Sequence, residues 1–293
     1  MTDYLIKGMA YDNQFRVYAI DATEAVAEAQ RRHDTWSASS AALGRTMVGS
    51  LLVATTGLKG DQKMTVIVNG NGLGGRILVD ANAQGDVKGY IQNPHVSLPL
   101  NANGKLDVRA VVGTEGTLSV IKDLGLKEPF SGQVPIVSGE LGEDFTYYMA
   151  NSEQIPSAVG LSVLVDTDDS IKVAGGFMIQ VLPFASDEAI ASIEKNIAEM
   201  PLVSRLMENG ATPEDILHRI LGEENVHFIE KMPVQFKCDC SHDRFKQGMA
   251  AIGTEELTAI IEEDHGAEVV CQFCGTKYNY TEDELTELLN ANK

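Results

Sequence analysis

Alternating and helical patterns of apolar residues organise the start of the chain. Across residues 4–20 apolar and polar positions alternate on either side of a turn at Asp12-Asn13, which predicts two paired strands. An Ala- and Glu-rich stretch follows as far as Arg32, and Asp21 or Thr23 is suited to cap it as a helix. The chain is therefore expected to open with a hairpin that leads into a helix.

Residues 37–182 are expected to supply most of the core. Over residues 37–54 apolar side chains occupy most of the circumference of a helix, so we expect this helix to be buried. From residue 62 onward Val, Ile and Gly become frequent, and residues 64–68 and 76–80 have the composition of strands. Residues 62–182 are thus predicted to form the sheets of the domain.

A faint internal repeat lies in this sheet-forming part. The sequence Leu78-Val79-Asp80, with the residues that follow it to Gln92, is echoed by residues 164–180. Two similar hairpins within one sheet system would explain the echo. A duplication and a chance reuse of hairpin residues both remain open, because hairpins draw on few residue types.

Residues 184–233 change to a helix-forming and acidic composition. Ser186 or Asp187 is suited to cap a first helix, and Thr212 followed by Pro213 is a strong start for a second one. Ten Asp and Glu residues stand against four Lys and Arg residues in this stretch. The pattern predicts an amphipathic, acidic helical connector that lies on a larger domain.

The last part of the chain, residues 234–293, has the pattern of a small mixed module. A strand leads to the first cysteine, a short helix begins at Thr254, and a strand over residues 268–270 runs into a turn that resembles a zinc knuckle, residues 271–275. A capping box at Thr281 starts the final helix. So small a module buries little apolar surface and gains most from a metal clip.

Together these patterns predict the α+β fold class in three parts. A large N-terminal domain of sheet and buried helix is expected over residues 1–183, a helical connector over residues 184–233, and a small C-terminal zinc-binding redox-switch module over residues 234–293. The 293 residues and the apolar content of 44% are sufficient for one large core and one small one.

Composition argues against several classes of function. The net charge of −19 disfavours sequence-independent binding to nucleic acid or to anionic membranes, because phosphates favour clustered Lys and Arg. The most apolar segment, residues 47–58, is too short and too polar to span a bilayer, and the N-terminus lacks the pattern of a signal peptide. We therefore expect a cytoplasmic protein, whose cysteines are available for metal or redox chemistry.

All four cysteines lie in the C-terminal module, as two close pairs. Cys238-x-Cys240 and Cys271-x-x-Cys274 are separated by thirty residues. Four thiolates presented in this way can surround one tetrahedral Zn²⁺ ion, and the same sulfurs could also form two short-range disulfides. Structural zinc contributes on the order of 10–16 kcal/mol to small domains. An oxidant that removed a thiolate ligand would therefore remove the metal and then the fold, which predicts a zinc site that acts as a switch.

Two histidines and a glycine-rich turn are weaker candidates. His242 is placed to be a replacement or auxiliary ligand, but four cysteines already complete the tetrahedron, so we expect an exposed loop histidine. His33 is expected to be a core or cap residue. The segment from Gly70 to Gly75 satisfies G-x-G-x-x-G, yet a strand follows it instead of a helix, so we expect a hairpin turn and no dinucleotide site. No nucleotide-hydrolysis or hydrolase motif is present, and no catalytic residue is predicted.

Several segments, beyond the cysteine spacing, resemble the 33-kDa heat-shock chaperone family. The similarity extends over essentially the whole of this acidic chain. It is carried by Tyr4-Leu5-Ile6-Lys7-Gly8, Ala42-Leu43-Gly44-Arg45, Gly89-Tyr90-Ile91 with Asn93-Pro94, Phe236-Lys237-Cys238, and Cys271-Gln272-Phe273-Cys274 with Tyr278. One departure is Trp36-Ser37-Ala38, where the family is expected to have Ser-Pro near the start of the helix, and it concerns only the local cap.

The resemblance implies a redox-regulated, ATP-independent chaperone, a holdase, and not an enzyme. In the reduced form Cys238, Cys240, Cys271 and Cys274 would bind one zinc ion, and the protein would be inactive. Oxidative stress would form the disulfides Cys238–Cys240 and Cys271–Cys274 and release the metal. The module and then the connector would become disordered and expose apolar surface to unfolding client proteins, and the active form would be a homodimer.

Two other functions fit the cysteine pairs less well. A zinc-ribbon module for nucleic acid would need basic and aromatic residues, whereas residues 241–293 hold eleven Asp and Glu against four Lys and Arg. A thiol–disulfide oxidoreductase would need Cys271-x-x-Cys274 at the start of a helix, whereas a strand is expected on each side of the motif. The favoured prediction is therefore a chaperone controlled by its cysteines, with no nucleic acid or membrane as partner.

Overall fold

The computed structural model describes residues 2–99 and 106–291 and divides them into two compact units, which meet in sequence between Lys237 and Cys238. Sheets and helices occur in both units, so the predicted α+β class is confirmed. The division into three parts stays a prediction, because the helices of the expected connector pack within the first unit. Among the described residues, no helix is both long enough and apolar enough to cross a bilayer.

The first sheet of the first unit has five antiparallel strands in the order β10-β1-β2-β9-β8. Its strands are β1 (Tyr4–Ala10), β2 (Phe15–Asp21), β8 (Ser157–Val165), β9 (Ile171–Val181) and β10 (Val226–Pro233). The predicted opening hairpin is confirmed as β1 and β2. The stretch predicted as a helical connector, residues 184–233, ends in a strand that the sequence analysis did not predict, because its last eight residues form β10 by pairing along β1.

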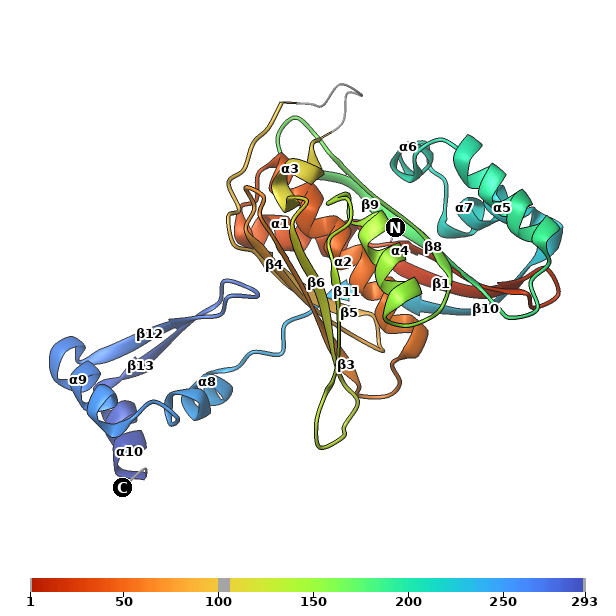
Figure 1. Cartoon of the computed structure of the whole chain (residues 1–293). Helices are drawn as coiled ribbons and strands as arrows, with labels where there is room; N and C mark the ends of the chain where they lie inside the picture. The colour runs from red at the N-terminus through yellow and green to blue at the C-terminus, as the bar shows by residue number, and fades with distance from the viewer. Residues whose placement is uncertain (1, 100–105, 292–293) are drawn as a thin grey trace. The chain divides into compact units, whose positions relative to one another are not determined.

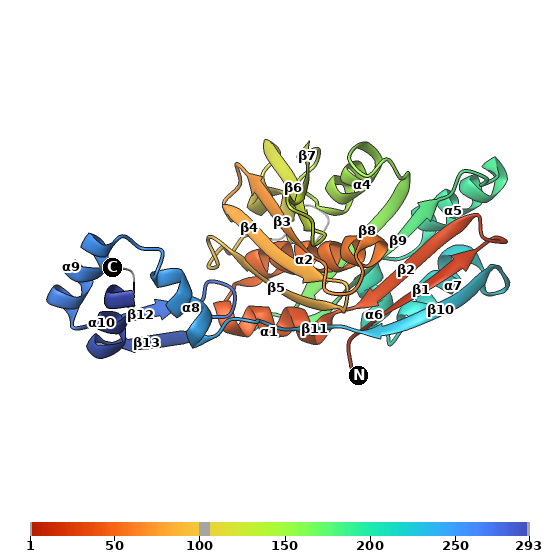
Figure 2. The ribbon, with the colours of Figure 1, turned by 90° about the horizontal axis from the view of Figure 1, so that it is seen from below.

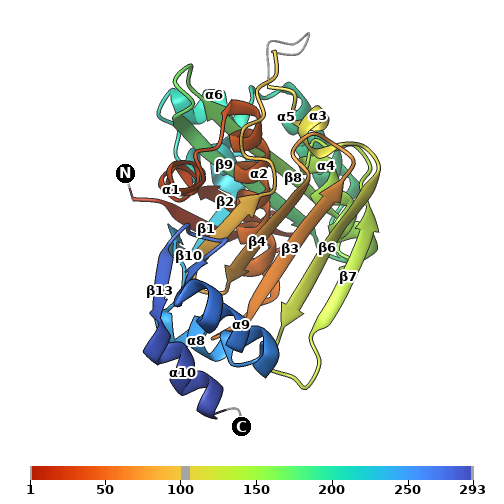
Figure 3. The same ribbon diagram turned by 90° about the vertical axis from the view of Figure 1, so that its left-hand side faces the viewer.

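The second sheet has six strands in the order β11-β5-β4-β3-β6-β7, and Figure 3 shows β4, β3, β6 and β7 side by side. Its strands are β3 (Lys63–Gly70), β4 (Arg76–Asn82), β5 (Asp86–Ile91), β6 (Gly116–Asp123), β7 (Phe130–Pro135) and β11 (Gln235–Phe236). The glycine-rich segment joins β3 to β4 as the predicted hairpin turn, with Asn69 opposite Arg76. The two echoing hairpins lie in different sheets, so their expected place within one sheet system is wrong.

Helix α2 (Ser37–Gly57) lies between the two sheets and contacts strands of both (Figures 1 and 2). Every residue from Ala38 to Thr55 except Arg45 is buried, which confirms the predicted buried helix. Gly49 has a steric role here, since an added Cβ would lie 2.4 Å from the ring of Phe145. The shorter helices of this region are α1 (Thr23–His33), α3 (Val108–Val112) and α4 (Gly142–Asn151).

The cap of α1 differs from the prediction. Asp21 bonds to Thr23, whereas the carboxylate of Asp3 accepts hydrogen bonds from the backbone N–H groups of Glu24 (3.0 Å) and Ala25 (2.8 Å). Burial raises the pKa of Asp3 to about 6, against the lowering effect of these two bonds. A residue just before β1, 21 and 22 positions upstream of Glu24 and Ala25, therefore supplies the cap, because the pairing of β1 with β2 places Tyr4 opposite Asp21 near the start of the helix.

The connector helices pack on the face of the five-stranded sheet that α2 does not cover (Figure 1). They are α5 (Asp187–Glu199), α6 (Val203–Glu208), α7 (Pro213–Leu221) and the 3₁₀ turn η1 (Glu223–Asn225). The predicted cap at Ser186 and the predicted helix start at Thr212 are both confirmed, and Thr212 forms a capping box with Asp215. Ile193, Ile216 and Leu217 from these helices join Phe15 and Ile179 of the sheet in one apolar cluster.

The second unit is a hairpin with three helices. Its elements are α8 (His242–Met249), α9 (Thr254–Asp264), β12 (Gly266–Val270), β13 (Lys277–Thr281) and α10 (Glu282–Ala291). The expected loop at His242 is wrong, because α8 starts there with Ser241 as its cap, which accepts from the N–H of Arg244. Among the described residues the core is six buried side chains: Met249, Leu257, Ile261, Tyr280, Leu285 and Leu288.

Candidate metal centre

The four cysteines converge in the second unit as free thiols. The Sγ atoms of Cys238 and Cys271 are 3.8 Å apart, and those of Cys240 and Cys274 are 3.3 Å apart. All four sulfurs lie within 4.8 Å of one another. These two contacts join sulfurs of different pairs of the sequence, and tertiary structure brings the two pairs to one point.

The turn between β12 and β13 positions two of the sulfurs. The backbone N–H groups of Cys274 and Gly275 donate to the carbonyl of Cys271, at 3.3 and 2.8 Å, and the N–H of Cys271 donates to the carbonyl of Thr276. Gly275 has a φ of 71°, in the left-handed region that glycine adopts without strain. This geometry is that of the expected knuckle. Cys271 and Cys274 are buried, while Cys238 and Cys240 are half-buried.

The donor set is consistent with zinc. Four sulfurs at about 2.3 Å from one Zn²⁺ ion in a tetrahedron lie about 3.8 Å from each other. The distances of 3.3 and 3.8 Å and the limit of 4.8 Å for the whole set bracket this value. Four soft thiolates in tetrahedral arrangement select zinc or iron–sulfur chemistry over the oxygen-seeking magnesium and calcium ions. The residues present therefore fit a single four-cysteine zinc site.

The electrostatics of the bare thiols also favour a cation. Burial raises the pKa of the Cys238 and Cys271 thiols, because it disfavours their charged forms. Burial acts in the same direction on Cys274, but hydrogen bonds with Thr276 and with the neighbouring thiols lower its pKa to about 7. The raised pKa values of Cys238 and Cys271 mean that their thiolate forms are disfavoured without a cation, and a positive charge among the sulfurs would favour them.

Two polar side chains that our sequence prediction did not assign to the site contact the sulfurs. The hydroxyl of Tyr278 lies 3.2 Å from Sγ of Cys240, and that of Thr276 lies 3.2 Å from Sγ of Cys274. The bond to Cys240 raises the pKa of the Tyr278 phenol. Their positions two and four residues after Cys274 were a usable signal, since a strand that leaves the knuckle passes close to it.

The two histidine candidates lie apart from this chemistry. The ring of His242 stacks on Tyr280 at 4.2 Å, and its Nε2 is 3.3 Å from the carbonyl of Asn279. Within the described residues the group placed to hold a metal consists of the four cysteines without His242. His33 is half-buried at the end of α1, 6.5 Å from the ring of Tyr90, as expected of a structural residue.

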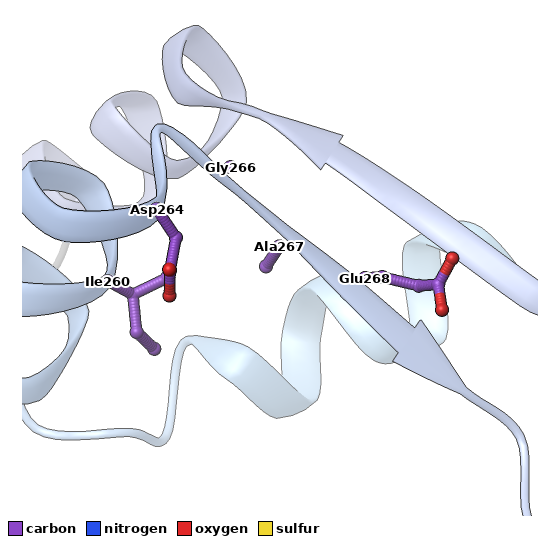
Figure 4. Close-up of a pocket in the computed structure, with 5 residues that line it drawn as sticks. All are labelled: Ile260, Asp264, Gly266, Ala267 and Glu268. Atoms are coloured by element: carbon purple, nitrogen blue, oxygen red, sulfur yellow. The ribbon is translucent and has the colours of Figure 1, made fainter.

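A hollow of about 440 Å³ lies elsewhere in the second unit, between α9 and β12. Figure 4 shows its lining, in which the carboxylates of Asp264 and Glu268 lie on either side of Ala267 and do not converge. Its remaining lining residues are Ile260 and Gly266. The cysteine cluster is therefore the part of this unit with a recognisable chemistry.

Comparisons with known proteins agree with this geometry. A family model described as "Hsp33 protein" matches residues 3–281. The chain belongs to the Hsp33 family. The "33 kDa chaperonin" of Enterococcus faecalis is 64% identical over 288 residues, covering 98% of this chain and 96% of that protein. The protein of the same name from Levilactobacillus brevis is 60% identical over 289 residues, covering 99% of this chain and 98% of the relative.

A solved Hsp33 structure shares the fold. The crystal structure of the 33 kDa chaperonin from Thermotoga maritima superposes with a TM-score of 0.92 at 40% identity, and the match covers 99% of each chain. The predicted family is thereby confirmed. Hsp33 relatives are named chaperonins and not enzymes, and the chain is a chaperone of this family.

Proposed function

We propose that this Hsp33 chain is a redox-regulated, ATP-independent holdase that binds unfolding proteins during oxidative stress. The observation that carries the proposal is the convergence of four thiols in a unit whose described core has only six buried side chains. When bound, a Zn²⁺ ion would hold the four thiolates and tie the two cysteine segments together. Cys238, Cys240, Cys271 and Cys274 are thus both the zinc ligands of the reduced form and the residues that sense oxidant.

Oxidation converts the ligands to disulfides, which we assign as Cys238–Cys240 and Cys271–Cys274. In each case two thiols give two electrons and two protons to one molecule of peroxide, which becomes two molecules of water. The assignment follows the family resemblance, because the sulfur contacts of 3.8 and 3.3 Å run between the pairs and do not by themselves indicate it. Both disulfides remove thiolate ligands, so the second unit loses its metal clip and then its fold.

The connector, residues 184–233, is the part that responds. Its helices bury Ile193, Ile216 and Leu217 against the five-stranded sheet, and its released form would offer this apolar surface, and the sheet face beneath it, to clients. Its ten acidic residues would keep the exposed segment in solution. This assigns separate roles to residues 1–183 as scaffold, to the connector as binding element and to residues 234–293 as sensor.

Three further features belong to the proposal. The partners are unfolded or partly folded proteins, and neither nucleic acid nor membrane is expected at a surface with a net charge of −19. The active form is a homodimer. The protein acts in the cytoplasm, where a reducing environment keeps the switch off until oxidant accumulates.

The test compares reduced protein with protein treated with peroxide at a denaturing temperature or with hypochlorite. Released zinc, free thiols and suppression of aggregation of a thermally unfolded client are measured in the same samples without ATP. We expect zinc release, thiol loss and client protection to rise together. A reduced, zinc-loaded protein that protected clients equally well would remove the switch from the proposal and leave a constitutive chaperone.

A further inference from the structure

Strand β10 occupies the whole edge of β1, and Figure 2 shows the two strands side by side. The register runs from Tyr4 opposite Pro233 to Ala10 opposite Val226. β10 is the last element of the connector and ends five residues before Cys238. The edge strand of this sheet is therefore part of the segment that, in the proposed function, is released on oxidation.

The contact between β10 and β1 is made mainly by the backbone. Of the eight residues of β10 only Met232 is buried, and Val226 and Phe228 are half-buried. The other side chains are exposed, including Ile229, which lies at a bulge and is 64% exposed. A backbone ladder does not depend on sequence, so the edge of β1 is suited to chains of many sequences.

The outer edge of β10 and the edge of β1 that it covers differ in how strongly they resist pairing with a further strand. β10 presents Glu230, Lys231, Pro233 and its bulge to the outside, which are features that discourage a further strand. In β1, Lys7 is the one charged residue among seven. Without β10, this seven-residue strand would be an open and largely apolar edge, which is a template for extended chains.

We propose that the edge of β1, once β10 has left it, binds an extended segment of an unfolding protein as an added antiparallel strand. This inference rests on the proposed function, because it needs the release of the connector. β10 serves as the internal occupant of the edge in the resting state, and the client takes its place. A client segment with an acidic residue opposite Lys7 should bind best, because Glu230 of β10 forms an ion pair of 3.0 Å with Lys7 in the resting state.

A second copy of this chain is a poorer occupant than a client. Lys7 is the central residue of β1, so a full-length antiparallel pairing of two β1 edges would place Lys7 opposite Lys7. Like charges directly opposite each other destabilise a strand pair.

Hydrogen exchange of the amides of residues 4–10 in the full chain tests the inference. We expect protection in the reduced protein, exchange about tenfold faster after oxidation, and renewed protection when reduced, carboxymethylated lactalbumin, which cannot fold, is added. Suppression of aggregation is measured in parallel and reports the proposed function separately. If clients are protected from aggregation but the lactalbumin does not slow exchange, the edge of β1 is not the binding site. The inference is then contradicted, while the proposed function is retained.

Two other outcomes would also overturn it. Protection of residues 4–10 in the oxidised protein without lactalbumin means that the edge is already occupied. If that protection is lost on dilution, the occupant is a second copy, and if it is independent of concentration, β10 has stayed in place.

A pair of adjacent substitutions in β10 provides a test without oxidant. Phe228→Asp removes a ring that packs on the connector cluster, 5.2 Å from the ring of His218, whereas Ile229→Asp makes the same change at the exposed bulge. In the reduced protein we expect Phe228→Asp to make hydrogen exchange of the amides of residues 4–10 about tenfold faster. Added lactalbumin should slow this exchange again. Ile229→Asp should match the parent protein. An opened edge that lactalbumin leaves unprotected contradicts the inference.

Discussion

The two units of this Hsp33 chain are stabilised in different ways. The first unit buries α2 between two sheets and covers the outer face of one sheet with the connector helices, which gives two apolar clusters. The second unit has six buried apolar side chains among its described residues and four thiols at one point. Burial alone accounts for the first unit, whereas the second has a core of the size that usually needs a metal or disulfide.

This difference suits the second unit to the proposed role of sensor and the first unit to that of a stable scaffold. A unit held by a few metal ligands can lose its fold when one ligand is oxidised, because the loss is large compared with its remaining stability. A unit held by many apolar contacts keeps its fold through the same event. The connector shares features of both units. Its apolar side chains pack on the five-stranded sheet, and its last strand ends five residues before Cys238.

The largest expected effect is the loss of the second unit in Cys271→Ser. This substitution removes a buried cysteine from the proposed zinc site, and structural zinc is worth on the order of 10–16 kcal/mol in small domains. We expect the amides of residues 242–291 to lose protection from hydrogen exchange, while the core of the first unit keeps its own. Gln272→Ser, at an exposed position of the same turn, is the control. A second unit that stayed protected would show that its apolar core suffices.

The next largest effect is expected in the connector. Leu217 is fully buried in the cluster that joins α7 to the sheet, so Leu217→Ala should cost about 2–5 kcal/mol of the stability of that cluster, measured by urea denaturation. The reduced protein should also gain client protection. Leu202→Ala, at a residue that is 45% exposed, should change little. Equal effects of the two substitutions would contradict the role given to the cluster.

A smaller effect, dependent on pH, is expected at Asp3 in the first unit. Its pKa is raised to about 6 from the ordinary 3.8, so its stabilising contribution is fully present below pH 3.8 and is lost as the pH rises through 6. Relative to Asp3→Asn, the parent protein should lose on the order of 1 kcal/mol between pH 5 and pH 7. Urea midpoints of both proteins measure this. A difference that is constant over this range would be inconsistent with the raised pKa.

The smallest effect is expected on the surface of the second unit. Lys277 and Glu268 form an ion pair of 2.9 Å across the β12–β13 hairpin, with both side chains about half exposed or more. Water and salt screen such pairs, so Glu268→Gln should cost less than about 1 kcal/mol of the zinc-loaded unit. Thermal unfolding at low and high salt checks this. A larger cost would mean that the hairpin depends on charge and not only on its cysteines.

The sequence by itself determined the local elements and the donor set. Periodicity identified the buried helix α2, capping residues marked the starts of α5 and α7, and the spacing of the cysteines identified two pairs of candidate ligands. These features are local, because a helix period, a cap or a knuckle turn is encoded within a few neighbouring residues.

Tertiary structure decided what depends on distant partners. The strand β10 forms because the edge of β1 is available to it, and the cap of α1 comes from Asp3 because the pairing of β1 with β2 places Tyr4 opposite Asp21 near the start of that helix. The cross-pair contacts of Cys238 with Cys271 and of Cys240 with Cys274 likewise need the hairpin and the incoming segment to meet. Hydrogen bonds between remote segments leave no periodic trace in the sequence, so composition placed residues 226–233 in the helical connector and did not reveal that they cover the edge of β1.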